Sequence, residues 1–121
     1  MTAQHLRSVE AKAFVPAKDF VLAQRFYQEL GFTMEWANDE VAQFRHGPCS
    51  FLLQNFYRAE LADNFMMHLQ VEDVDRWWAA LQPVVLRHGV RCEAPSDKPW
   101  GMRDFAMVDP SGVLWRIGQT L

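Results

Sequence analysis

The sequence lacks the features that would mark a secreted, membrane-bound or nucleic-acid-binding protein. Cys49 and Cys92 are its only cysteines among 121 residues and form no CxxC motif, as expected for a chain kept in a reducing cytosol. No segment approaches the ~20 apolar residues of a membrane helix. The first dozen residues have no apolar stretch after their charges, so we expect no signal peptide. The net charge is −3 without any basic run. We therefore expect a cytoplasmic protein with no membrane or nucleic acid partner.

Common catalytic motifs are absent as well. The chain has no G-x-S-x-G, no phosphate-binding loop and no dinucleotide fingerprint. No convincing general base accompanies Cys49 or Cys92 in the sequence, so we expect both thiols to be buried and inert. His5, His46 and His88 fall at a terminus, a turn and a helix end, where we expect them to face solvent.

Apolar bulk, by contrast, is plentiful. Half of the residues are hydrophobic, and nine Phe and five Trp supply large side chains for a core and for binding surfaces. The length suits one domain with a real core and is short for two independent ones.

The first half of the chain predicts one strand, one helix and three further strands. Asp19 is placed to cap a helix whose apolar residues recur at i, i+3, i+4 and i+7 and which ends at Gly31. The expected strands span residues 12–15, 33–37, 41–45 and 50–54. Module one therefore covers residues 9–57, approximately.

The same pattern restarts after a connector at residues 56–64, in which we expect about one helical turn. Asp73 is placed to cap a second helix that Gly89 closes, and Pro83 should kink that helix or split off its last turn. The expected strands span residues 66–71, 90–93, 103–108 and 114–117. Module two covers approximately residues 65–120. Because one unit alone cannot cover its apolar sheet face, we expect a single α+β domain, residues 1–121, made of two βαβββ modules.

Several motifs occur in a characteristic order along these modules. They are Asp19-x6-Phe-Tyr-x2-Leu-Gly-Phe, Val71-Glu72-Asp73-Val74, Pro99-Trp100-Gly101-Met102-Arg103-Asp104-Phe105 and Asp109-Pro110-x-Gly112. With them the chain resembles the vicinal oxygen chelate superfamily, which includes glyoxalase I, extradiol dioxygenases and bleomycin-resistance proteins, and is most similar in style to the last branch. The resemblance implies curved mixed sheets that form a cup, and a homodimer that shares the halves of its cups.

The resemblance implies that, if this chain were one of the superfamily's enzymes, a divalent metal would lie inside the cup. The positions that would hold it are Lys12, Met66 and Arg116 in this sequence. An ammonium and a guanidinium offer no lone pair near neutral pH, and a thioether suits hard metals poorly. His68 has the same strand parity as Met66 and is the remaining candidate ligand, although a lone histidine more often lines a wall. We therefore predict no metal, no cofactor and no catalytic residue.

Strand alternation and the resemblance together predict a groove that binds an organic molecule. Trp100, beside Pro and Gly, has no structural explanation in helix or strand periodicity. By motif alignment, drug-groove roles fall on Trp100, on Glu35 with Trp36, and on Gln54. The expected ligand-binding residues are Trp36, Trp100, Glu35, Gln54, His68, Asp104 and Arg116. Two alternatives stay open: Trp36 packs at a dimer interface, or Arg116 and Lys12 pair with Asp104 or Glu35 and fill the place of a metal.

The leading prediction is metal-independent sequestration of a flat organic ligand. One ligand of this kind would be a cationic aromatic antibiotic of the bleomycin type. The main alternative is a glyoxalase-like lyase or dioxygenase that uses shifted metal ligands such as His68, or that acts without metal through Arg116 and Asp104. A third is a regulatory or structural dimer with a vestigial cup. Retained metal or turnover would favour the enzyme, and a groove too narrow for any ligand would favour the third reading.

Overall fold

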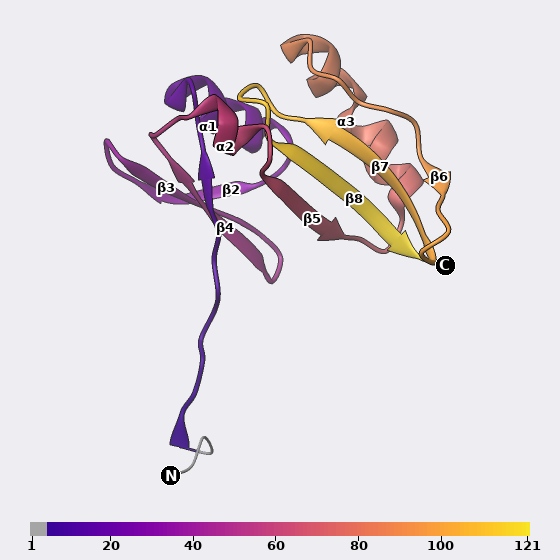
Figure 1. The fold of residues 1–121 in the computed structure, drawn as a ribbon, viewed down its shortest axis with the longest axis horizontal. Coiled ribbons are helices and arrows are strands. Elements are labelled where there is room, and N and C mark those ends of the chain that lie inside the picture. Colours follow the sequence, from indigo (N-terminus) through magenta and orange to yellow (C-terminus); the bar gives the residue numbers. More distant parts are fainter. Residues whose placement is uncertain (1–4) are drawn as a thin grey trace.

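The fold consists of two four-stranded mixed sheets placed side by side (Figure 1). The computed structural model describes residues 5–121. The strand orders are β1-β4-β3-β2 and β5-β8-β7-β6, so the second sheet repeats the first strand for strand. In each sheet the opening strand runs parallel to the closing one, while the other pairs are antiparallel. The predicted α+β fold of two βαβββ modules is confirmed.

The first module matches its prediction closely. Asp19 caps α1 by accepting a hydrogen bond from the backbone N–H of Leu22 (3.1 Å). Gly31, just beyond the helix, has a φ of +106°, a conformation that favours glycine. The elements are β1 (Phe14–Pro16), α1 (Phe20–Glu29), β2 (Thr33–Ala37), β3 (Val41–His46) and β4 (Cys49–Gln54). Strand β1 begins two residues later than the expected start at Lys12.

The second module begins after the short helix α2 (Ala59–Ala62), the helical turn expected in the connector. Its elements are β5 (Met66–Gln70), α3 (Val74–His88), β6 (Ser96–Asp97), β7 (Met102–Val108) and β8 (Leu114–Thr120). Asp73 caps α3 by accepting from the backbone N–H of Arg76 (3.1 Å), and Gly89 ends it with a φ of +63°.

In this module the alternative in which Pro83 splits off the last helical turn is wrong, and so is the strand expected at residues 90–93. Helix α3 continues through Pro83 to His88 and does not lose its last turn. Residues 90–93 are not a strand: Cys92 forms a single bridge to Met107, and the paired strand β6 lies at Ser96–Asp97 instead. Pro95 lies between the two segments and has no N–H for a sheet ladder, which is consistent with a strand that forms only beyond it.

A buried hydrogen-bond chain connects the two modules behind the sheets. The Tyr27 hydroxyl donates to Asp109 Oδ2 (2.5 Å) and accepts from Trp115 Nε1 (2.8 Å). Asp109 Oδ1 accepts from the backbone N–H groups of Ser111 (2.8 Å) and Val113 (2.9 Å). The rings of Phe51 and Trp115 lie 5.4 Å apart in the same core. The motif around Asp109 is thus a structural joint between the modules.

The helices lie on one face of the sheets and leave the other face open. Phe51 and Leu53 of β4 are buried against the core, while Ser50, Leu52 and Gln54 are partly exposed, as alternation predicts. No helix within residues 5–121 is long and apolar enough to cross a membrane.

Candidate functional site

The first open face is the side of the first sheet that the helices leave uncovered. Strand β2 is irregular there: Met34 pairs with Phe44 and Trp36 with Gln43, so Glu35 is an extra residue, a β-bulge. Paired residues share a sheet face, so Trp36 lies on the face of Gln43. Glu35 contacts the Gln43 side chain, so the bulge places two consecutive side chains on one face. Trp36 is 46% exposed.

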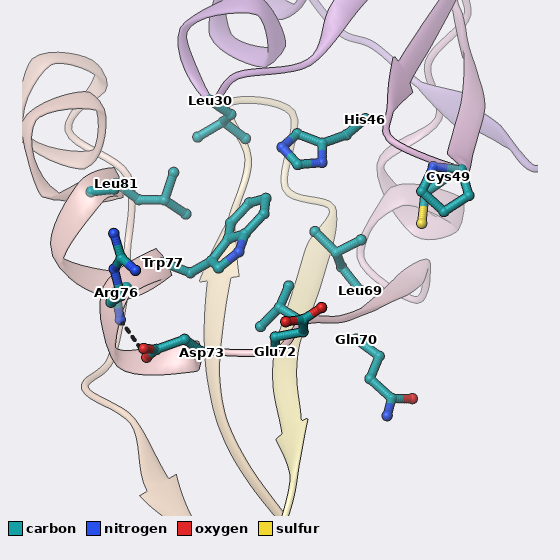
Figure 2. A pocket seen from close by; sticks show the side chains of 13 residues that line it. Leu30, His46, Cys49, Leu69, Gln70, Glu72, Asp73, Arg76, Trp77 and Leu81 are labelled. Atoms are coloured by element: carbon teal, nitrogen blue, oxygen red, sulfur yellow. Dashed lines mark hydrogen bonds between the residues drawn. The ribbon is translucent and has the colours of Figure 1, made fainter.

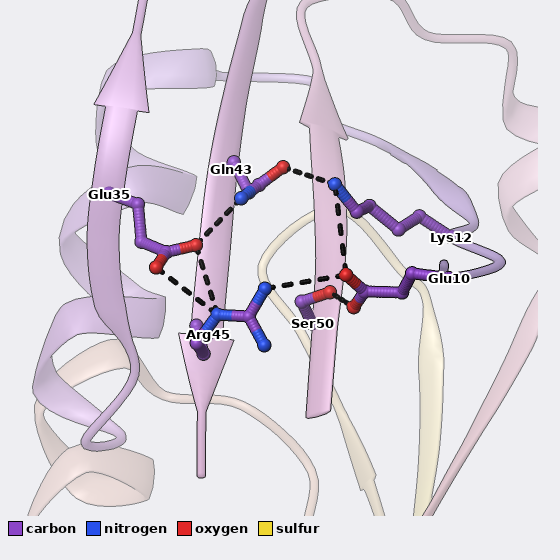
Figure 3. Close-up of polar contacts among 6 residues, drawn as sticks. All are labelled: Glu10, Lys12, Glu35, Gln43, Arg45 and Ser50. Carbon is purple, nitrogen blue, oxygen red and sulfur yellow. Dashed lines mark hydrogen bonds and ion pairs between the residues drawn. The ribbon is translucent and has the colours of Figure 1, made fainter. Parts of the chain in front are cut away.

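A polar network covers much of this face (Figure 3). Lys12 Nζ donates to Gln43 Oε1 (2.6 Å), and Gln43 Nε2 donates to Glu35 Oε1 (2.6 Å). Arg45 Nε contacts both Glu35 oxygens at 3.1 Å, and its Nη2 reaches Glu10 Oε1 at 3.3 Å. The hydrogen bond from Gln43 is the main cause that lowers the pKa of Glu35, so this carboxylate is ionised at neutral pH. Each charge in the network has an opposite partner.

Lys12 pairs directly with neither of the two carboxylates considered from the sequence, Asp104 and Glu35. Its ammonium meets Glu35 only through the Gln43 amide, and it lies 3.9 Å from Glu10. Gln54, the other residue expected here, is partly exposed on β4. Its side chain makes no hydrogen bond within residues 5–121.

The second open face carries a charged cluster around a buried carboxylate. Asp104 is only 1% exposed, and its Oδ1 lies 3.4 Å from Arg116 Nη1 and 3.6 Å from Lys98 Nζ. The pairing of Arg116 with Asp104, weighed above as one of two possibilities, is therefore present. Gly118 makes room for this carboxylate, because a Cβ on residue 118 would lie 3.0 Å from the Asp104 Cβ. We name Lys98, Trp100, Asp104 and Arg116 the Arg116 cluster.

Trp100 completes this cluster from the turn between β6 and β7. The turn is closed by a hydrogen bond from the Gly101 N–H to the Lys98 carbonyl (3.2 Å), and Gly101 has a φ of +84°. The guanidinium carbon of Arg116 lies 5.7 Å from the centre of the Trp100 ring, a cation–π contact. The indole is still 57% exposed.

The seven residues predicted for the site thus fall on two sheets. Asp104, Arg116 and Trp100 come together in one cluster, and His68 is paired with Arg116 across neighbouring strands. His68 is exposed and makes no hydrogen bond or ion pair within residues 5–121. Lys98 was missed, because its side chain reaches Asp104 only through the β6–β7 pairing, and that strand was expected elsewhere.

The positions that would hold a metal do not fit one. Lys12 and Arg116 present cationic donors, each engaged with a neighbouring side chain, and Met66 is 56% exposed. Within residues 5–121 no three His, Cys, Asp or Glu side chains are grouped as metal ligands.

A separate cleft of about 710 Å³ opens between the two modules (Figure 2). None of the seven predicted residues lines it. Its walls include Leu30, His46, Leu69, Trp77 and Leu81, with Cys49, Glu72 and Arg76 among its polar groups. Its walls are mainly apolar and aromatic, which suits an organic molecule.

The histidine and cysteine predictions need correction at four positions. The His46 ring lies 4.9 Å from Trp77 and 5.5 Å from Phe32, so it packs against both rings and is only partly exposed. The His88 side chain is 7% exposed and lies against Phe26. Cys49 is exposed at the start of β4, where it lines the cleft. Cys92 is half-buried, and burial raises the pKa of its thiol.

Two four-stranded mixed sheets built from paired βαβββ modules define a class of small α+β proteins, and the comparisons place this chain in it. Residues 6–117 match the sequence model of the Glyoxalase/Bleomycin resistance protein/Dioxygenase superfamily. The protein belongs to this superfamily.

Solved structures share the fold. A bleomycin-binding protein in complex with bleomycin superposes with a TM-score of 0.81 at 24% identity, over 94% of this chain and 100% of the other. TnmS3, an antibiotic-binding protein from Streptomyces sp. CB03234, gives 0.76 at 25% identity, over 97% and 100%. Lactoylglutathione lyase from Agrobacterium tumefaciens gives 0.70 at 16% identity, over 93% and 95%. No curated protein matches the sequence.

Proposed function

We propose that this protein binds and sequesters a small, flat organic molecule, such as an antibiotic, without a metal and without transforming it. The observation that carries the proposal is the pair of exposed indoles, Trp36 and Trp100, on the open faces. Indole rings bury large area at low entropic cost and stack on flat ligands. The likeness to two antibiotic-binding structures over almost the whole chain supports the same function.

The proposal includes a homodimer in the cytoplasm. Each open face keeps large apolar side chains at the surface, among them Phe14 (50% exposed) and Met66 (56%). A second copy that covers these faces would bury them and close a groove between the first sheet of one protomer and the second sheet of its partner. Such a groove would bring Glu35 and Trp36 to the same ligand as the Arg116 cluster.

Titration of tryptophan fluorescence tests the binding. After a chelator has removed metal and has itself been dialysed away, we expect bleomycin or another flat aromatic antibiotic, cationic or acidic, to quench the fluorescence. Trp100→Ala should weaken binding of that compound by more than ~1 kcal/mol because stacking is lost. Leu86→Ala, at an 80% exposed position on α3, is the matched control and should leave affinity unchanged.

A second preparation, purified without chelator, separates binding from catalysis. An unchanged affinity in Trp100→Ala would contradict the stacking. Near-stoichiometric Zn, Ni, Mn or Fe that survives dialysis, or turnover of a glyoxal-type or catechol-type substrate, would replace sequestration with an enzyme of the same superfamily.

A further inference from the structure

Arg116 has hydrogen-bond donors that the protein does not use. A guanidinium carries five N–H donors. Within residues 5–121 its only hydrogen bond is the 3.4 Å contact from Nη1 to Asp104 Oδ1. The side chain is 31% exposed on the open face, so the remaining donors are accessible to a ligand.

Around Arg116 the negatively charged side chain is buried and the positively charged ones are more exposed. Asp104 is 1% exposed, whereas the Lys98 side chain is 19% exposed and shares the same carboxylate oxygen with Arg116. Glu93 lies 3.9 Å from Lys98, but its side chain is 54% exposed and solvent screens it. Two cations therefore share one buried carboxylate, and both are more exposed than it, so the charge that a ligand meets first is positive.

Trp100 and Asp104 also fix the direction of the guanidinium. The ring lies on one side of it, at 5.7 Å, and the carboxylate holds Nη1. A planar fork held in this way matches the two oxygens of a carboxylate or phosphate, and little entropy is lost when it binds them. A cationic ring on Trp100 would instead meet Arg116 and be repelled.

The first open face offers no such group. Arg45 contacts both oxygens of Glu35 and one of Glu10, and Lys12 is bound to Gln43. The cations on that face are already matched by carboxylates.

From these contacts we infer that the Arg116 cluster binds the oxyanion of an aromatic acid, with its ring against Trp100 and its carboxylate, or a similar oxyanion, on Arg116 and Lys98. The inference rests on the proposed binding function and specifies the charge of its ligand. It reverses the cationic preference considered from the sequence.

Three probes with the same ring test it on the full-length protein: 2-naphthoate, 2-naphthamide and 2-naphthylmethylammonium, each titrated by tryptophan fluorescence. We expect the carboxylate to bind about tenfold more tightly than the amide, because a charge-assisted hydrogen bond is added. The cation should bind most weakly. Raising the salt concentration should weaken the binding of 2-naphthoate and leave the binding of 2-naphthamide unchanged.

Variants assign the effect to this cluster. Arg116→Gln should bring 2-naphthoate to the affinity of the amide, and Arg116→Lys, which keeps the charge without the fork, should cause a smaller loss. Arg87→Gln is the control, because Arg87 is a 57% exposed arginine on α3 paired with Glu29. Thermal denaturation checks that each variant is folded.

The outcomes distinguish this inference from the proposed function. Equal affinity for all three probes, or unchanged naphthoate binding in both Arg116 variants, overturns the oxyanion assignment while binding itself stands. If no probe and no antibiotic binds, both proposals fail.

Discussion

The hydroxyl group of Tyr27 connects the first module to the second by hydrogen bonds. It donates to Asp109 and accepts from Trp115, and all three side chains are buried. Burial raises the pKa of Asp109, while the hydrogen bond from Tyr27 and three backbone N–H groups oppose that rise. Burial and the neighbouring carboxylate raise the pKa of Tyr27 well above its usual range, so its hydroxyl stays a donor at neutral pH.

Removing this hydroxyl should destabilise the protein in a pH-dependent way. Tyr27→Phe leaves Asp109 Oδ2 and Trp115 Nε1 without their partner, and we expect a loss of about 2–3 kcal/mol near pH 7. The pKa of Asp109 should rise further in the variant. A carboxyl whose folded pKa is raised stabilises the fold fully below its unfolded pKa, about 3.9, and that stability is lost as the pH rises through the folded pKa.

The difference between wild type and Tyr27→Phe should therefore grow from pH 4 to pH 7 in urea denaturation. Tyr57→Phe removes a partly exposed hydroxyl that makes no hydrogen bond within residues 5–121, and it should have little effect at either pH. A difference that is constant with pH would contradict the role given to Asp109.

Much of the site at the residue scale could not be read from the sequence. One oxygen of Asp109 accepts from backbone N–H groups of its own turn, which a local Asp-Pro-Ser-Gly sequence favours. Its second oxygen bonds a tyrosine 82 residues away, and no local pattern encodes such a pair. The packed surroundings of His46 and His88 arise in the same way, from contacts between elements.

At the scale of elements, the order of strands and helices was predictable because capping residues and apolar spacing are local signals. Asp19, Asp73 and Gly89 mark helix ends in the sequence and do so in the structure. The bulge at Glu35 was not predictable, because strict alternation places Glu35 and Trp36 on opposite faces. Strand β6 was misplaced because a two-residue strand carries no periodicity.

A side chain at Gly118 of β8 is expected to destabilise the protein. A Cβ there would lie 3.0 Å from the Asp104 Cβ and 3.1 Å from the Met102 Cε. Methionine can move, but a Cβ next to the β7 backbone moves only with its strand. We expect Gly118→Ala to cost about 1–3 kcal/mol in urea denaturation, as overpacking does.

The matched substitution is Ser96→Ala, at the position of β6 that pairs with Asp104. It should change stability by less than about 0.5 kcal/mol because the residue is exposed. Equal stability of Gly118→Ala and wild type would show that the two strands can separate at this point.

At the scale of the whole molecule, the two open faces lead us to expect a dimer. Sedimentation velocity should give about twice the 14.1 kDa of one chain. Phe14→Asp should shift the protein toward monomer, because a partner that covers this half-exposed position would then bury an unpaired charge. Leu86→Asp, on the outer side of α3, should remain dimeric. A monomeric wild type would contradict the groove between protomers.

The long-range bond at Tyr27 also has a consequence for the order of folding. The pairings β2–β3, β3–β4 and β7–β8 are short-range, whereas the Tyr27–Asp109 bond closes a separation of 82 residues. The chain must lose the entropy of closing this long loop before the bond can stabilise it. We therefore expect the Tyr27–Asp109 bond to form after the transition state. Tyr27→Phe should then accelerate unfolding and leave the refolding rate nearly unchanged in stopped-flow experiments. The joint would thus govern how long the native protein persists more than how fast it forms.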